Sequence, residues 1–142
     1  MTRIDFHFNA TDKLSHCCRL VRKIYRAGQK VVVFNDDANG IASLDRALWT
    51  FSQLDFIPHV MAGDPLAAQT PVLLAAEAVD TAHHDILVNL ATGSPSFFSS
   101  FERMIEVVGT DPDDRNRARE RFRYYKDRGY PIETFDLAAA GN

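Results

Sequence analysis

The sequence predicts a three-layer α/β fold, in which helices flank a mostly parallel central sheet. Short segments rich in β-branched residues alternate with segments whose apolar residues recur at helical spacing, and this alternation is typical of strand–helix–strand units. The segment 30–34, KVVVF, is continuously apolar after its lysine, as expected of a strand that is buried on both faces. At 142 residues the chain has the length of one domain, and we expect a single domain over residues 1–142.

The first half of the chain is expected to contain two strand–helix pairs. The predicted elements are, in order, strand 2–8, helix 12–27, strand 30–34 and helix 39–50. The first strand is indicated by its alternation of polar and apolar residues. Thr11 or Asp12 can cap the first helix, because a short side-chain oxygen accepts a hydrogen bond from a free N–H of the first turn. Gly28 suits the left-handed position that follows the end of a helix.

The second half is expected to contain four short strands and a long final helix. The predicted elements are strands 58–61, 72–76, 86–90 and 104–108, followed by helix 111–128. Asp111 can cap this helix, Pro112 suits its first turn and Gly129 ends it. Between the last two strands, the turn-rich segment 92–100 contains two of three nearby phenylalanines. We expect these rings to pack a tight turn against the edge of the sheet.

The composition indicates a cytoplasmic protein. Its residues are 46% hydrophobic and 25% charged, which is ordinary for a globular domain. No run of about 18 apolar residues is present, and the N-terminus lacks the apolar centre of a signal peptide. Cys17 and Cys18 are adjacent, and neighbouring side chains on a helix point about 100° apart. We therefore expect two reduced thiols, one of them packed inward.

The charges are distributed unevenly along the chain. The formal net charge is −3, yet residues 115–128 contain seven bases and two acids, for a local balance of +5. The remaining residues contain 9 bases and 17 acids, for a balance of −8. An acidic body with one basic helix argues against a protein that wraps nucleic acid. It favours a local face that binds an anion.

The sequence gives little indication of enzymatic chemistry. No phosphate-binding glycine loop, zinc-protease motif, nucleophile elbow or CxxC pair is present. Asp36 and Asp37 follow a predicted strand, where α/β enzymes often place acids, but we favour a role for them in starting the next helix. His83 and His84 are adjacent, and adjacent side chains on a strand point to opposite faces, so we expect a solvated turn there. We predict no active site, no cofactor and no metal site.

The predicted final helix carries the best candidate for a binding site. Arg119 and Arg123 are four residues apart and therefore lie on one face of the helix, with Phe122 beside them. Two guanidinium groups beside an aromatic ring can bind a carboxylate while the ring contacts an apolar group. This arrangement suits an acidic peptide that ends in a hydrophobic residue. The alternative is a solvated helix face with Phe122 and Tyr125 buried in the core.

A second candidate is the aromatic stretch 44–59, LDRALWTFSQLDFIPH. Leu44, Leu48 and Phe51 recur at helical spacing and are predicted to form a buried stripe. Trp49 falls off that stripe, and Phe56 lies beyond the expected end of the helix. Large aromatic residues outside the packing pattern are candidates for a partner surface. The alternative is that both rings complete the core.

Several segments together resemble one known family. These are IDFHF at 4–8, LDRALW at 44–49, FIPH at 56–59 and ARERFRYYKDRGY at 118–130. They resemble, in the same order and over nearly the whole chain, the chi subunit of the bacterial DNA polymerase III holoenzyme. The resemblance implies a Rossmann-like fold that binds no nucleotide and a non-catalytic accessory role in DNA replication.

The resemblance also implies two partners. Trp49 and Phe56 match residues that face the psi subunit, a small protein that links chi to the clamp loader. Arg119, Phe122 and Arg123 match residues that bind the acidic C-terminal tail of the single-stranded-DNA-binding protein. The family typically has Lys at the position of Arg123 and Tyr at that of Phe122, so charge and ring are kept. We expect no sequence-specific nucleic-acid binding and no membrane contact.

Two other functions remain open from the sequence. The first is a small Rossmann-like enzyme that uses Asp36 or Asp37. The second is a module that binds nucleic acid directly through helix 111–128.

Overall fold

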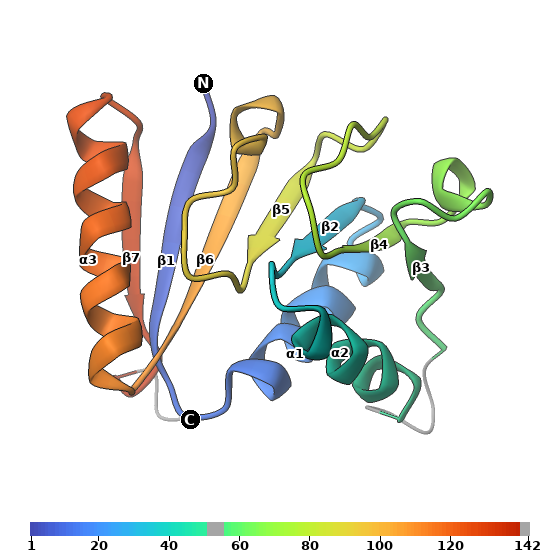
Figure 1. The fold of residues 1–142 in the computed structure, drawn as a ribbon, viewed down its shortest axis with the longest axis horizontal. Helices are drawn as coiled ribbons and strands as arrows, with labels where there is room; N and C mark the ends of the chain where they lie inside the picture. The colour runs from blue at the N-terminus through green and yellow to red at the C-terminus, as the bar shows by residue number, and fades with distance from the viewer. Residues whose placement is uncertain (51–55, 140–142) are drawn as a thin grey trace.

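The computed structural model describes residues 1–50 and 56–139, and these residues form one seven-stranded sheet with three α-helices (Figure 1). The elements are β1 (Arg3–Ala10), α1 (Lys13–Arg26), β2 (Val31–Phe34), α2 (Ala38–Thr50), β3 (His59–Met61), β4 (Val72–Ala75), β5 (Ile86–Asn89), β6 (Arg103–Gly109), α3 (Pro112–Asp127) and β7 (Ile132–Asp136). Two short 3₁₀ turns lie at Ala67–Gln69 and Phe98–Ser100.

All seven strands are parallel, in the order β3-β4-β2-β5-β6-β1-β7. Helices α1 and α2 pack on one face of the sheet, whereas α3 and the segment with the second 3₁₀ turn pack on the other (Figure 1). The three-layer α/β prediction is therefore confirmed. The strands β2, β4 and β5 are buried at every position, because helices or loops cover both faces of the sheet.

The local signals at the helix ends are confirmed. Asp12 caps α1 and accepts a hydrogen bond from the Ser15 N–H at 3.1 Å. Asp111 caps α3 and accepts one from the Asp114 N–H. After these two helices, Gly28 and Gly129 have φ of 78° and 81°. Only glycine adopts such angles without steric cost.

The sequence did not predict β7, which pairs with β1 at the edge of the sheet. Its sequence, IETFD, is half polar and largely exposed, so it lacks the apolar run that identifies the inner strands. A parallel edge strand that is covered on one face only gives a weak periodic signal.

Two further expectations hold only in part. Cys17 and Cys18 are free thiols, as predicted, but both of them are packed inward and not one, because both face the core between α1 and the sheet. Burial raises the pKa of the Cys18 thiol to about 11, so the thiol stays protonated at neutral pH.

The turn at His83 and His84 was expected to be solvated. His83 is buried instead, and its Nε2 donates to the Thr70 carbonyl at 2.6 Å. Of the two adjacent histidines, His84 is the exposed one.

Two imidazole rings, those of His7 and His16, pack against each other at a tilt of 58° between β1 and α1. His7 Nδ1 lies 3.0 Å from His16 Nε2, so one ring donates a hydrogen bond to the other. Burial, with the nearby His7 and Arg19, lowers the pKa of His16 from 6.5 to about 4. Burial also lowers the pKa of His7.

The His7–His16 pair predicts a pH dependence of stability. Between pH 6.5 and about pH 4, the His16 ring is protonated in the unfolded chain but not in the folded chain. The stabilising contribution of His16 is therefore complete above pH 6.5 and is lost as the pH falls towards 4. We expect the melting temperature of His16→Gln to fall less than that of the unsubstituted protein over this window, measured by circular dichroism. Parallel curves for the two proteins would contradict the prediction.

Candidate functional site

A cavity of about 320 Å³ lies between α3 and the strands at the β7 edge of the sheet. Its walls are lined by Phe6, Phe8, Val108, Arg115, Ala118, Arg119, Phe122 and Thr134. The floor is apolar because alternate β1 residues, Phe6 and Phe8, point towards α3. The rim is cationic because Arg115 and Arg119 lie four residues apart on the helix. The cavity therefore combines a pocket for an apolar side chain with two donors for a carboxylate.

Two of the three residues predicted for the peptide site line this cavity. Arg119 is exposed and donates to the Asn116 side chain at 2.9 Å, so its guanidinium is held near the helix surface. Phe122 is half-buried, with its ring centroid 5.4 Å from that of Phe6. Arg123 lies outside the cavity. It lines a neighbouring depression of about 380 Å³, together with Arg119, Phe122 and Lys126.

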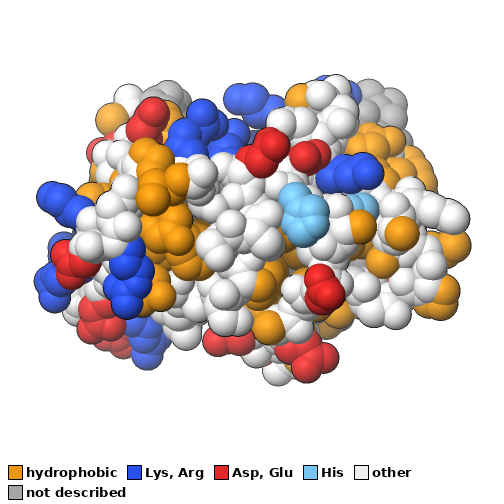
Figure 2. All heavy atoms as spheres, turned by 90° about the horizontal axis from the view of Figure 1, so that it is seen from above, with side chains coloured by type: hydrophobic (Ala, Val, Ile, Leu, Met, Phe, Trp, Pro, Cys, Tyr) orange, Lys and Arg blue, Asp and Glu red, His pale blue; other side chains and the backbone are white. Residues whose placement is uncertain are grey.

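The end of the molecule that carries α3 shows Lys and Arg side chains interspersed with acidic ones (Figure 2). Within α3 the acids are Asp113, Asp114, Glu120 and Asp127. The surface of α3 is therefore of mixed charge, and two of its six bases, Arg115 and Arg119, line the cavity.

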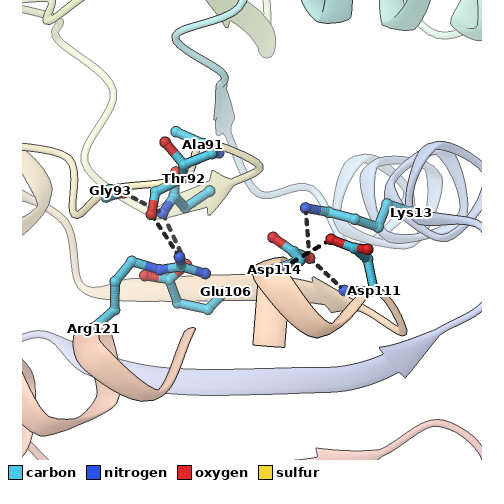
Figure 3. A network of polar contacts seen from close by, with 10 residues as sticks. Lys13, Ala91, Thr92, Gly93, Glu106, Asp111, Asp114 and Arg121 are labelled. Atoms are coloured by element: carbon cyan, nitrogen blue, oxygen red, sulfur yellow. Dashed lines mark hydrogen bonds and ion pairs between the residues drawn. The ribbon is translucent and has the colours of Figure 1, made fainter. Parts of the chain in front are cut away.

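A buried polar network fixes α3 on the sheet (Figure 3). Glu106 on β6 is fully buried, and Arg121 on α3 is only 4% exposed. Arg121 Nε donates to Glu106 Oε1 at 3.1 Å, and the Tyr125 hydroxyl donates to Oε2 at 2.5 Å. The Asn89 side chain on β5 donates to Oε1 at 2.8 Å. Burial raises the pKa of Glu106, whereas the Arg121 charge and the three donors oppose that rise.

The same network reaches the loop after β5. Arg121 Nη1 donates to the Thr92 carbonyl at 2.8 Å, and Asn89 Nδ2 lies 3.1 Å from the Gly93 carbonyl (Figure 3). Two polar anchors one helical turn apart, Arg121 and Tyr125, thus hold α3 at a fixed rotation. That rotation turns Arg119 and Phe122 towards the cavity.

A second polar cluster joins the starts of α1 and α3 (Figure 3). Lys13 Nζ lies 3.1 Å from Asp114 Oδ2, which also accepts from the Gly109 N–H at 2.7 Å. Arg115 donates to the side chain of Asn9, which itself donates to Asp136. This cluster lies at the carboxyl ends of β1 and β6, where many α/β proteins bind their ligands.

The predicted aromatic surface is exposed. Trp49, near the end of α2, is 53% exposed, and Phe56, before β3, is 66% exposed. Their ring centroids lie 5.5 Å apart. Beneath them, the buried His59 ring lies 4.5 Å from the Trp49 ring and donates from Nδ1 to the Ile57 carbonyl at 2.7 Å. The alternative that both aromatic residues complete the core is therefore wrong.

His59 supports this pair of rings from below. Its Nε2 lies 3.0 Å from Asp45 Oδ1, which makes an ion pair when the ring is protonated. The stripe predicted from Leu44 and Leu48 is buried, but its third member, Phe51, lies outside the described residues.

The acids after β2 behave as helix-starting residues. Asp37 accepts a hydrogen bond from the Asn39 N–H at 3.0 Å, and its own N–H is bound by Asn35. Asp36 and Asp37 are both exposed. Among residues 1–50 and 56–139, no group of three His, Cys, Asp or Glu side chains could hold a metal ion. Within the same residues, no helix is long and apolar enough to cross a membrane.

Sequence reasoning missed Phe8 and Thr134 as parts of this cavity, and it missed the burial of Arg121. The signal for Arg121 was present in the sequence. Glu106 is a lone carboxylate within an apolar strand, MIEVV, and a buried charge requires a partner. The partner of Glu106 could not be identified as Arg121 from the sequence, because α3 carries several arginines and the spacing does not show which of them faces β6.

Comparisons with known proteins agree on one family. A family model described as "DNA polymerase III chi subunit, HolC" matches residues 1–133. A DNA polymerase III subunit chi from Pseudomonas aeruginosa is 36% identical over 141 residues, which cover 96% of this chain and 98% of the relative. Proteins of the same name from Escherichia coli (strain K12) and Haemophilus influenzae are each 28% identical over 118 residues. These cover 82% of this chain and 80% and 82% of the two relatives.

Proposed function

This chain belongs to the DNA polymerase III chi subunit family, and from that membership we propose a bridging role in the replication machinery. The protein is a non-catalytic accessory subunit in the bacterial cytoplasm. Through a psi-like partner it contacts the clamp-loader part of the polymerase, and through α3 it binds the C-terminal tail of the single-stranded-DNA-binding protein. The observation that carries the proposal is the cavity of about 320 Å³ with an apolar floor and an arginine rim.

The cavity suits a peptide that ends in an apolar residue. The apolar side chain enters between Phe122 and the β1 rings, where its burial is favourable. Its terminal carboxylate then lies beside Arg119 and Arg115, which can bind it with charge-assisted hydrogen bonds. Upstream acidic residues of the peptide pass over the second depression, beside Arg123 and Lys126. Arg123 was predicted to bind the terminal carboxylate together with Arg119, and because it lies outside the cavity we assign it instead to the acidic part of the tail.

The aromatic surface suits the second partner. Trp49 and Phe56 together form an exposed apolar patch at the opposite end of the sheet from α3. Exposed aromatic anchors of this kind often dominate the binding energy of protein interfaces. The separation of the two surfaces lets one copy of the protein hold both partners at once.

The peptide site is tested by one substitution and one chemical change. Hydrogen bonds to a charged group are worth about 1.5–3 kcal/mol, so Arg119→Ala is expected to weaken binding of an acidic, apolar-ended peptide roughly 10- to 100-fold. Amidation of the peptide's C-terminus removes the ion pairs with both Arg119 and Arg115 and is expected to cost at least as much. Both affinities are measured by isothermal titration calorimetry.

The matched control is Arg117→Ala, which removes an exposed arginine of the same helix that does not line the cavity. It is expected to change the affinity little, because screened surface charges contribute weakly. An amidated peptide that binds as tightly as the free acid would refute the carboxylate mechanism. Equal losses for Arg117→Ala and Arg119→Ala would show that only the net charge of α3 matters.

A further inference from the structure

Helix α1 carries the most one-sided charge of the three α-helices in the described part of the chain. Its sequence, KLSHCCRLVRKIYR, contains five bases and no acid. By comparison, α3 contains six bases and four acids. Although the residues outside 115–128 have a net negative charge, they therefore include a second basic element, α1.

Four of the five bases on α1 share one face. Arg19, Arg22, Lys23 and Arg26 line a shallow depression of about 300 Å³. Their spacing of three, four and seven residues places them on one side of a helix. The opposite side of α1 packs into the core through Cys17, Val21 and Ile24, among others. We call the four residues the α1 basic face.

This arrangement of four positive charges does not stabilise the helix itself. Like charges three or four residues apart destabilise a helix, and the face contains four such pairs. Lys23 and Arg26 lie in the last turn of α1, where the helix dipole favours positive charge. That effect fades within one turn and does not account for Arg19. A repulsive surface of this kind is stabilised when a polyanion binds to it.

An aromatic strip lies beside the α1 basic face. Phe135 on β7 is 41% exposed, and its ring packs edge-on against His7 at a centroid distance of 5.2 Å. His7 packs in turn against His16 on α1. His16 and Arg19 line one depression together with Leu137, which follows β7. Basic side chains that follow a phosphate backbone, next to rings that can stack on bases, are the usual elements of single-strand binding.

We propose that the α1 basic face and Phe135 bind single-stranded nucleic acid without sequence preference. The site lies back to back with the peptide cavity. Successive β1 residues point to opposite faces of the sheet, so Phe6 and Phe8 line the cavity whereas His7 faces α1. The depression at the α1 basic face is lined by its four basic residues, whereas aromatic rings contribute to the lining of the peptide cavity. The proposal does not depend on the peptide site, and each can fail without the other.

The experiment measures fluorescence anisotropy of a labelled oligothymidylate titrated with the full chain at several salt concentrations. For single strands, the logarithm of the affinity falls with the logarithm of salt by about 0.7 per phosphate neutralised. We expect a slope of about −2 to −3 for four basic residues. The variant Arg19→Glu with Lys23→Glu is expected to lower the affinity at least 10-fold and to reduce the slope by about 1 to 2. Arg22 and Arg26 are left in place because they also interact within the chain.

Two further variants sharpen the test. The double variant Arg117→Glu with Arg128→Glu changes the net charge by the same amount as the α1 variant, but at residues on and just after α3. We expect it to leave most of the affinity intact. Phe135→Ala is expected to weaken binding several-fold with an unchanged salt slope, because stacking releases no counterions. Peptide binding and circular dichroism confirm that each variant is folded.

Three outcomes would overturn the proposal. The first is the absence of binding at low salt, and the second is an equal loss in the α1 variant and in the α3 control. The third is displacement of the oligonucleotide by polyglutamate of the same charge at equal concentration, which would show that the face binds acidic polypeptides instead.

Discussion

Arg121→Ala is expected to cost about 3–5 kcal/mol of unfolding free energy, the usual cost of breaking a buried ion pair from one side. The substitution leaves the Glu106 carboxylate fully buried with donors from Tyr125 and Asn89 but no opposite charge. It also removes the donor to the Thr92 carbonyl. Urea unfolding of the variant and of Arg117→Ala, which removes an exposed arginine of the same helix, measures the effect. The control is expected to lie within about 0.5 kcal/mol of the unsubstituted protein.

The pH dependence of the Arg121→Ala variant provides a second test. Without Arg121, the pKa of Glu106 rises further, because the Arg121 charge and hydrogen bond no longer counteract the effect of burial. A carboxyl group whose pKa is higher in the folded state penalises folding above its unfolded pKa, and this penalty shrinks as the pH falls. The stability difference between the two proteins is therefore expected to narrow from pH 7 towards pH 5. A constant difference would mean that the loss comes from packing and not from the uncompensated charge.

Phe56→Ala is expected to abolish binding of the psi-like partner while leaving the fold and peptide binding intact. The ring is 66% exposed and touches Trp49, so its truncation opens no core cavity. As an interface hot spot it would contribute roughly 2–4 kcal/mol, which corresponds to about a 30- to 1000-fold loss of affinity. The measurement is co-purification with the partner, followed by titration.

Leu66→Ala is the matched control for Phe56→Ala. Leu66 is another exposed apolar residue, 56% accessible, but it lies in the loop after β3. We expect it to keep partner binding. If Phe56→Ala instead lowered the melting temperature as strongly as a core Phe→Ala change, which costs about 3–5 kcal/mol, the aromatic-surface assignment would be wrong.

Local signals account for the parts of the fold that the sequence predicted. Asp12, Asp111, Gly28 and Gly129 act within a few residues of their own positions, so their roles can be recognised in a single stretch of sequence. The inner strands were predicted because burial on both faces requires continuous apolar residues. The edge strand β7 was missed because pairing with β1 alone holds it in the sheet.

The candidate site was predictable only in part, for the same physical reason. The spacing of Arg119 and Phe122 indicated a shared face, but the cavity exists because Phe8 on β1 and Thr134 on β7 meet that face. Arg121 was counted with the bases of an anion-binding face, yet it points into the core. Charge patterns along one helix do not reveal which side chain meets a buried partner on another element.

The position of β1 in the sheet has a consequence for synthesis on the ribosome. This first strand lies between β6 and β7, with Ile4 opposite both Met104 and Ile132. The neighbour β6 is complete only at Gly109 and β7 only at Asp136, so the N-terminal strand lacks both neighbours through most of elongation. Contacts between such distant segments slow folding, and an unpaired strand is prone to aggregation until its neighbours arrive. The wall of the peptide cavity formed by β1 is therefore among the last parts of the molecule to be completed.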